Sequence, residues 1–448
     1  MLCFTNKLLV FLLFSVCLTV FGGNNAEKKL KKGRAASAPA IGEYDEKWGY
    51  IDVRSGAHMF WWLMVKNDTT RPLVVWLQGG PGASSTGFGN FDEIGPLDEN
   101  LNARQTTWLS KADLLFIDQP VGTGYSYVDS AADYTTNIDE IAADLLEWTK
   151  QWFTAHSAYQ TRPFYILCES YGGKMTAAWA KVLHQAIQNG EVNVNFKGVG
   201  LGDSWISPID YVTTWADYLY AFSFLGNQSY NALVEQATQC KSFVARGQWG
   251  RATDCWAAME TVVESNTDSV SFYNVLKRSD SDPWSQATKF RDRLFRHHVL
   301  AYRTTKSLNE LMNGPMKQKL GIPAHVTWGG QSNNVFNYQN DDFMKPVIDT
   351  VDYLLQNTDI KVAVFNGQLD LICDTIGTEK WVSQLKWPEL ASFHRLPRTY
   401  TRNRDGQTGM FYKQHKTFSF FWILRGGHMV AHDTPEAVDA MLNILFQQ

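Results

Sequence analysis

The chain has 448 residues, of which 44% are hydrophobic and 19% are charged, and its formal net charge at pH 7 is -4. This length suits either one large α/β domain with an insertion or two to three average domains. Because the charge is mild and no long run of one sign follows the first few dozen residues, the composition argues against a nucleic-acid-binding surface and against an acidic tail.

The N-terminal residues have the pattern of a secretory signal. Lys7 precedes an apolar run over residues 8–21, which two glycines follow. The run is shorter than the roughly 20 residues that a membrane-spanning helix needs, and small residues at its end suit a signal peptidase. We expect a signal peptide over residues 1–23. The mature protein is then secreted or lysosomal, with no membrane anchor after cleavage.

The next segment, residues 24–45, is polar and rich in lysine. This composition predicts a leader that is either trimmed by a processing protease or retained as a solvated arm. Two sequons further along the chain make Asn67 and Asn227 candidates for N-glycosylation.

Four cysteines remain once the signal is removed: Cys168, Cys240, Cys255 and Cys373. Cys240 and Cys255 are close in sequence and lie outside the strand-like segments, so they are the disulfide candidate. The cysteines lack the spacing of a zinc site, and the sequence contains no His-Glu-x-x-His pattern. We therefore expect no metal and no organic cofactor.

Short apolar runs bounded by turn residues recur along the chain and indicate buried strands at 73–77, 114–117, 164–167, 199–201, 362–365 and 418–424. Helical spacing of apolar residues lies between several of them, over 138–152 and 174–187. This alternation predicts a mostly parallel sheet with helices on both faces. It fails from about residue 210 to 346, where helical patterns dominate. We interpret that segment as a helical cap inserted over the carboxyl ends of the strands, within a domain that spans residues 46–448.

The first predicted central strand runs into Gly79-Gly80-Pro81-Gly82. Glycines allow a sharp loop whose bare N–H groups can bind an anion. A phosphate-binding loop would need a lysine and a serine or threonine after its last glycine, and this segment has no such lysine. A plain tight turn is the alternative.

The segment from Phe164 to Lys174 predicts a strand, a sharp turn with Ser170 at its apex, and a helix. This is the context of a nucleophile elbow, in which the residues two positions from the serine must be small. Gly172 meets that requirement, and Cys168 replaces the first glycine of the usual Gly-x-Ser-x-Gly pattern. The alternative role for Ser170 is a helix N-cap.

A nucleophilic serine needs a base and an orienting acid, and on elbow folds these follow in the order Asp or Glu, then His. His428 follows a predicted strand and two glycines, with His432 as the nearest alternative. Asp370 follows the strand at 362–365, with Asp374 and Asp203 as alternatives. We predict a triad of Ser170, Asp370 and His428.

The glycine-rich loop then has a chemical purpose. On this kind of fold, one oxyanion donor is the N–H after the nucleophile and the other comes from an earlier strand-end loop. We predict that the N–H groups of Tyr171 and Gly80 form the oxyanion hole.

With the segments 76–82, 169–173 and 426–430 together, the chain resembles the serine carboxypeptidase family. The segments 202–208, 366–371 and 386–390 are most similar to the retinoid-inducible branch of that family. The resemblance runs from about Trp48 to the C-terminus. It implies an α/β-hydrolase fold with a helical cap, and removal of residues from peptide or protein C-termini at acid pH.

The resemblance also implies a site for the α-carboxylate of the substrate at Trp76, Gln78, Glu93 and Glu169. Two glutamates placed close together would share a proton, so acid pH would favour binding of a carboxylate. Structural roles for both glutamates are the alternative.

Two residues depart from the family pattern. Most relatives carry asparagine where Gln78 stands and glycine where Cys168 stands, which predicts a working triad of modest activity. Cys373, near Asp370, is expected to be a free thiol at the edge of the site.

Two other functions remain open. The same triad could serve an esterase or acyltransferase, and a catalytically silent binding protein could use the cap. A homodimer is compatible with the sequence.

Overall fold

The computed structural model describes residues 31–33, 44–279 and 306–447. The predicted signal peptide over residues 1–23 and most of the predicted leader lie outside the described residues. Within that leader, residues 31–33 form the strand β1 (Lys31–Gly33), which pairs with β2. In the described part of the chain, no helix is both long enough and apolar enough to cross a bilayer.

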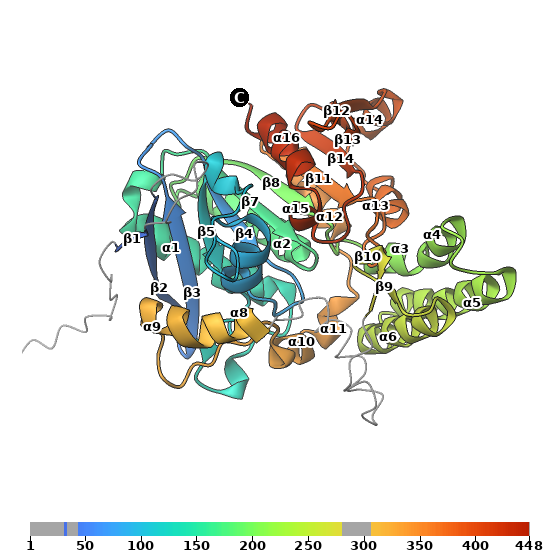
Figure 1. The fold of residues 1–448 in the computed structure, drawn as a ribbon, viewed down its shortest axis with the longest axis horizontal. Coiled ribbons are helices and arrows are strands. Elements are labelled where there is room, and N and C mark those ends of the chain that lie inside the picture. Colours follow the sequence, from blue (N-terminus) through green and yellow to red (C-terminus); the bar gives the residue numbers. More distant parts are fainter. Residues whose placement is uncertain (1–30, 34–43, 280–305, 448) are drawn as a thin grey trace, which may run out of the picture.

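A central sheet crosses the molecule in the order β1-β2-β3-β5-β4-β7-β8-β11-β14-β13-β12, and β6 pairs with β3 (Figure 1). The strands from β5 to β14 in this order are parallel, and antiparallel strands extend both edges. The bounds are β2 Tyr44–Arg54, β3 Ala57–Val65, β4 Leu73–Leu77, β5 Asp113–Ile117, β6 Tyr127–Val128, β7 Phe164–Glu169, β8 Phe196–Gly202, β11 Lys361–Gly367, β12 Thr399–Arg402, β13 Thr408–His415 and β14 Phe418–Ile423.

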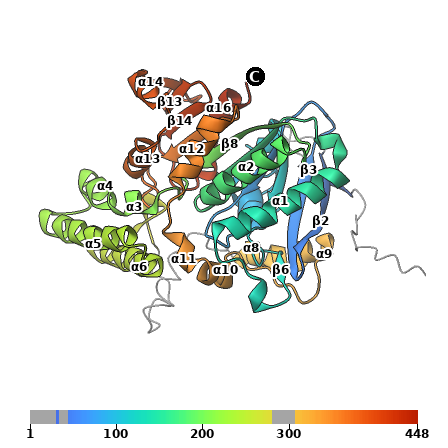
Figure 2. The ribbon, with the colours of Figure 1, turned by 180° about the vertical axis from the view of Figure 1, so that it is seen from behind.

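The predicted α/β class is confirmed, since helices cover both faces of this sheet (Figures 1 and 2). On one face lie α1 Ile138–Ala155, α2 Gly172–Gln188 and α12 Ile348–Asn357, and on the other lies α16 Pro435–Phe446. Helix α1 begins where the side chain of Asn137 accepts the N–H of Glu140. It then buries Ile141, Leu145 and Trp148 at helical spacing in the core on that face.

Shorter helical segments connect these elements. Their bounds are η1 Ser85–Ile94 (a π-helix), η2 Trp108–Ser110, η3 Ala131–Asp133, η4 Ser157–Tyr159, α13 Thr375–Val382, α14 Leu390–Arg395 and α15 Val430–Asp433. The π-helix η1 follows the glycine-rich loop after β4 and is buried along almost its whole length. It therefore belongs to the interior beside the carboxyl ends of the central strands.

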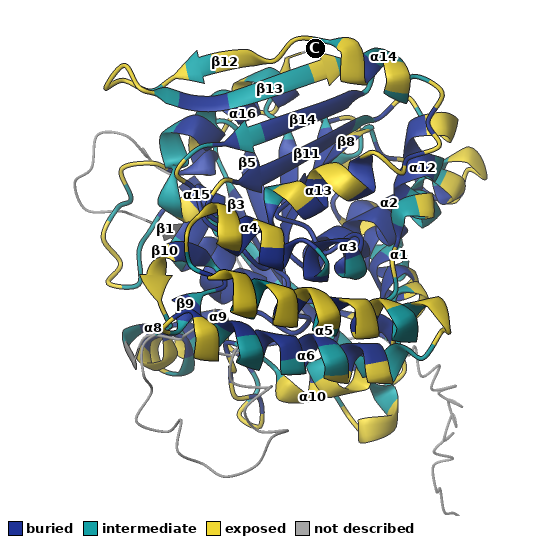
Figure 3. Ribbon diagram, turned by 90° about the vertical axis from the view of Figure 1, so that its right-hand side faces the viewer, coloured by how far each residue is buried: buried dark blue, intermediate teal, exposed yellow. Residues whose placement is uncertain are grey.

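Between β8 and β11 the chain leaves the sheet and builds a cap. Its elements are α3 Pro208–Val212, α4 Trp215–Ala221, α5 Asn227–Ala245, α6 Trp249–Asn266, β9 Val270–Ser271, β10 Asn274–Arg278, α8 Lys306–Leu311, η5 Met312–Met316, α9 Lys317–Leu320, α10 Asn333–Tyr338 and α11 Asn340–Phe343. Figure 3 shows that α4 and α5 expose their outward faces. Helical patterns dominate the sequence of this segment, and within it β9 and β10 form a short antiparallel hairpin that the sequence did not indicate.

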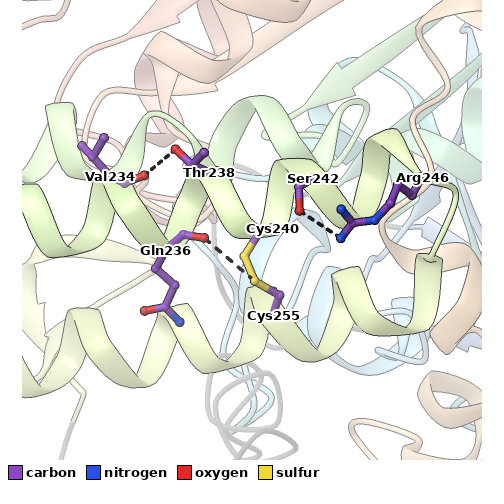
Figure 4. The surroundings of a disulfide bond; sticks show 7 residues. All are labelled: Val234, Gln236, Thr238, Cys240, Ser242, Arg246 and Cys255. Carbon is purple, nitrogen blue, oxygen red and sulfur yellow. Dashed lines mark hydrogen bonds between the residues drawn. A yellow bond between two sulfur atoms is a disulfide. The ribbon is translucent and has the colours of Figure 1, made fainter.

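The two long cap helices, α5 and α6, are joined by a disulfide between Cys240 and Cys255 (Figure 4). The two Cα atoms lie 5.4 Å apart, and 15 positions separate the cysteines in sequence. The disulfide candidate is thus confirmed. Cys168 and Cys373 are the free cysteines of the described chain, and both are buried.

Candidate active site

Ser170 lies at the apex of the turn between β7 and α2. Its φ is +61°, in the left-handed region that residues other than glycine seldom adopt. The N–H of Ser170 donates to the carbonyl oxygens of Gly202 and Asp203 at 3.1 Å each, and its own carbonyl accepts the N–H of Trp205 at 2.8 Å. These bonds to the end of β8 hold the serine in the strained conformation that a nucleophile elbow requires.

The neighbours of the elbow are small where the packing requires it. A Cβ on Gly172 would lie 2.6 Å from the carbonyl oxygen of Leu77 and 3.0 Å from Cβ of Cys168. Cys168 fits because its Sγ turns toward β8 and donates to the carbonyl oxygen of Gly200 at 3.2 Å. Burial raises the pKa of the Cys168 thiol to about 11, so this sulfur remains a neutral packing group.

His428 and Asp370 lie side by side at the carboxyl ends of β14 and β11. Nδ1 of His428 is 2.9 Å from Oδ2 of Asp370, and both side chains are fully buried. The parallel pairing of β11 with β14 brings the two strand ends together. Nε2 of His428 is buried and has no hydrogen-bond partner among the described residues. With Nδ1 carrying the proton toward the carboxylate, Nε2 is the nitrogen that can act as a base.

The alternative acids and base have other roles. Asp374 caps α13 by accepting the N–H of Gly377 at 2.9 Å, and it also accepts the hydroxyl of Thr214 at 2.7 Å. Burial raises its pKa to about 7. His432 bonds through Nδ1 to the backbone oxygen of Asp92 at 2.8 Å. Asp374 and His432 therefore do not form an acid–base pair with each other.

Asp203 connects the loop that carries the nucleophile to the loop that carries the acid. Its carbonyl oxygen accepts the N–H of Ser170, while its Oδ1 accepts the N–H of Gly367 at 2.7 Å and the side-chain amide of Asn366 at 3.2 Å. Burial and the neighbouring charge of Asp370 raise the pKa of Asp203 well above its usual value. These bonds give Asp203 a structural role, since they join the two loops.

The glycine-rich loop after β4 lies directly against the elbow. A Cβ on Gly79 would lie 2.5 Å from Cβ of Ser170 and 2.9 Å from the backbone nitrogen of Tyr171. Within the described chain, the N–H groups of Gly80 and Tyr171 donate no backbone hydrogen bond. The side-chain amide of Gln331 stabilises the loop by donating a hydrogen bond of 2.6 Å to the carbonyl oxygen of Pro81.

A buried ion pair that sequence reasoning missed supports Tyr171. Its hydroxyl donates to Oδ2 of Asp342 at 3.0 Å, and the same oxygen lies 2.8 Å from Nζ of Lys174. Burial lowers the pKa of Lys174 to about 8, although Asp342 favours the charged form. The partners are 168 positions or more apart in sequence, so no local pattern could have revealed this pair.

The four residues assigned to the carboxylate site meet around one amide. Oε1 of Gln78 accepts the indole N–H of Trp76 at 2.7 Å. Nε2 of Gln78 donates to Oε1 of Glu93 at 2.8 Å and to Oε1 of Glu169 at 3.0 Å. All four side chains are buried, and Oε2 of Glu93 has no hydrogen-bond partner in the described chain. Gly89 leaves the space for this cluster, because a Cβ there would lie 2.6 Å from Nε1 of Trp76.

Cys373 lies beside the acid–base pair. Its Sγ and ligand atoms of Asp370 and His428 all lie within 4.8 Å of one another, which makes them a candidate cluster for a soft cation. Burial, followed by the charge of Asp370, raises the pKa of the Cys373 thiol well above its usual value. The structure thus brings together the acid, the base and the free thiol that the sequence singled out.

Known proteins are similar to this chain over most of its length. A family model described as serine carboxypeptidase matches residues 39–448. Retinoid-inducible serine carboxypeptidase of Rattus norvegicus is 48% identical over 419 residues, which cover 91% of this chain and 92% of that protein. Serine carboxypeptidase-like 51 of Arabidopsis thaliana is 38% identical over 452 residues, covering 96% of each chain.

A solved structure shares the fold. The prohormone-processing carboxypeptidase Kex1(delta)p of Saccharomyces cerevisiae superposes with a TM-score of 0.74 at 21% sequence identity, covering 90% of this chain and 91% of that chain.

Proposed function

This chain belongs to the serine carboxypeptidase family, as its motifs predicted, and is a hydrolase; we propose that it removes C-terminal residues from peptides at acid pH through an acyl-enzyme on Ser170. The observation that carries the proposal is the bridge that the amide of Gln78 makes between the buried side chains of Glu93 and Glu169. That bridge lies next to the elbow, since Glu169 precedes Ser170 directly.

The proposed chemistry begins with His428. Its Nε2 takes the proton of the Ser170 hydroxyl as Oγ attacks the carbonyl carbon of the last peptide bond. Oδ2 of Asp370 accepts a hydrogen bond from Nδ1–H of His428, over 2.9 Å, and stabilises the imidazolium that forms. The N–H groups of Gly80 and Tyr171 bind the oxyanion of the tetrahedral intermediate.

The second half regenerates the enzyme. The imidazolium returns its proton to the leaving amine, the C–N bond breaks, and the C-terminal residue departs while the rest of the peptide stays esterified to Ser170. A water molecule, activated by Nε2 of His428, then hydrolyses the ester. The buried Nε2 atom, which no described residue engages, supports a role in both proton transfers.

The two glutamates explain why only the last bond would be cut. Two ionised carboxylates would repel the α-carboxylate of a substrate, whereas a protonated one can donate a hydrogen bond to it. Oε2 of Glu93 is buried and has no hydrogen-bond partner among the described residues, so it is available to a ligand. Binding should therefore strengthen as pH falls, in keeping with an acidic compartment.

Passage through the secretory pathway forms part of the proposal. The apolar N-terminal run supports it, as does the disulfide between Cys240 and Cys255. Asn67 and Asn227, the asparagines of the two sequons, are both exposed, which N-glycosylation requires. Mass analysis of the secreted protein, before and after enzymatic deglycosylation, tests this part.

The function is tested with purified protein and a dipeptide that is blocked at its N-terminus and free at its C-terminus. We expect release of the free amino acid, faster at about pH 5 than at about pH 7.5. The variant Ser170→Ala should lower the rate by about 10⁴-fold or more. Cleavage of a simple ester without cleavage of the dipeptide would favour an esterase instead. No reaction with either would favour a silent binding protein.

A further inference from the structure

The hairpin formed by β9 and β10 bonds directly to the loop that carries Asp370. The carbonyl oxygen of Phe272 accepts the N–H groups of Leu371 and Ile372, at 3.0 and 2.9 Å, and the N–H of Val275 donates to the carbonyl oxygen of Leu369 at 3.0 Å. In Figure 1 the hairpin lies between the cap helices and the strands β11 and β14. The cap is therefore hydrogen-bonded to the backbone of the loop that carries Asp370.

The same hairpin also bonds to the base. The carbonyl oxygen of Tyr273 accepts the N–H of His428 at 2.7 Å, and its ring meets the imidazole edge-on with centroids 5.2 Å apart. A Cβ on Gly427 would overlap that carbonyl oxygen, so the backbone before His428 lies against the hairpin with no space between them. Phe272, Tyr273 and Val275 thus hold both loops of the acid–base pair.

The side chains of Asn274 and Asp433 form a further contact between the hairpin and the backbone before His428. Nδ2 of Asn274 donates to Oδ2 of Asp433 at 2.9 Å, and this oxygen also accepts the N–H of Gly427 at 2.9 Å. Asn274 is 6% exposed, and its own Oδ1 accepts the N–H of Leu276 at 3.1 Å, which fixes the orientation of the amide. Lys277 contacts the other oxygen of Asp433 at 3.1 Å from an exposed position.

We propose that the β9–β10 hairpin is a positioning element for His428 and that Asn274 is the residue that fixes it there, through Asp433 and Gly427. A hairpin this short has little stability of its own, so its geometry depends on the bonds that it makes to neighbouring loops. Displacement of a general base by about 1 Å can cost roughly 100-fold in rate. The cap then contributes to the chemistry through the position of His428.

The test uses the rate at which phenylmethylsulfonyl fluoride inactivates the full protein, because Ser170 reacts with it only when His428 is in place. In Asn274→Asp, a carboxylate of the same size faces Asp433. We expect inactivation and kcat to fall by about 100-fold while KM for a dipeptide stays within about two-fold. Lys277→Ala, which removes only the exposed contact with the same aspartate, should stay within about two-fold of the parent.

Asn274→Ala removes the donor to Asp433 without adding a charge, and it should lower both rates while KM stays within about two-fold. If Asn274→Asp does not fold, as judged by thermal melting, Asn274→Ala carries the comparison. A parent rate in folded Asn274→Asp or in folded Asn274→Ala overturns the proposal.

The inference rests on the proposed function, and the two can fail separately. If the parent protein is not inactivated at all, the triad itself is wrong. If the parent is inactivated and Asn274→Asp reacts equally fast, only the role of the hairpin is wrong.

Discussion

The side-chain amide of Gln78 donates a hydrogen bond of 2.8 Å to Oε1 of Glu93. The same nitrogen donates to Glu169 at 3.0 Å, so one neutral group holds two buried acids together. The extra methylene of a glutamine, compared with an asparagine, does not prevent contact with either acid.

The first prediction concerns that amide. Gln78→Leu preserves the approximate volume but leaves both glutamates and the indole N–H of Trp76 without this partner, at a cost of about 1–3 kcal/mol for each buried group. We expect a lower melting temperature and a KM for a free-acid dipeptide raised by about 10-fold or more, both measurable with purified protein. Gln78→Asn should bring no gain in turnover. A gain would show that the methylene does displace the site.

The second prediction follows from the close approach of Gly79 to the nucleophile. In Gly79→Ala the new methyl group would lie 2.5 Å from Cβ of Ser170 and 2.9 Å from the nitrogen of Tyr171, so one of them must move. We expect kcat to fall by about 100-fold or more, as when an oxyanion donor is lost. Gly226→Ala is the matched control, because nothing lies within 4 Å of a Cβ there and its φ is -87°. Equal losses in the two variants would contradict this arrangement.

Much of this site could be predicted because its residues follow strands that are themselves clear in the sequence. The runs that became β4, β7 and β11 are short, apolar and bounded by glycine or polar residues, and each is followed by a candidate site residue at its carboxyl end. The family motifs added Glu93, which no strand pattern indicates.

The relations that the sequence did not reveal depend on contacts between distant segments. The strands β9 and β10 are too short to show alternation, and Tyr273 owes its importance to one bond made by a backbone oxygen to His428. Likewise, no local pattern indicates that Lys174 pairs with Asp342. Partners of this kind can be recognised only when the fold is known.

The third prediction is a pH dependence of stability caused by Asp203. Its pKa is raised in the folded protein by burial and by Asp370. The stability that it contributes is therefore present in full below its unfolded pKa of about 3.8 and is lost as pH rises through the folded value. Asp203→Asn keeps an oxygen for the N–H of Gly367 and cannot ionise.

We expect Asp203→Asn to melt at a higher temperature than the parent at neutral pH, with the difference shrinking as pH falls toward about 4. Melting curves of both proteins across that range measure it. A difference that is constant or grows toward acid pH would contradict the assignment.

The fourth prediction concerns Cys373. Its thiol is buried beside Asp370 and His428, and its raised pKa keeps it protonated. Because alkylation needs the thiolate, iodoacetamide should react slowly, whereas a small mercurial should bind the sulfur and inhibit the enzyme. The variant Cys373→Ala should retain activity and resist the mercurial. Full activity of the parent after stoichiometric mercurial binding would show that this sulfur lies away from the reacting atoms.

The central claim is that the cluster of Trp76, Gln78, Glu93 and Glu169 restricts Ser170 to peptide bonds next to a free C-terminus. The most direct measurement is mass spectrometry of one peptide in two forms, free acid and C-terminal amide, incubated with the protein at about pH 5. We expect stepwise loss of residues from the free acid and none from the amide. Cleavage of both forms at similar rates would contradict it, because a site that binds the α-carboxylate cannot treat them alike.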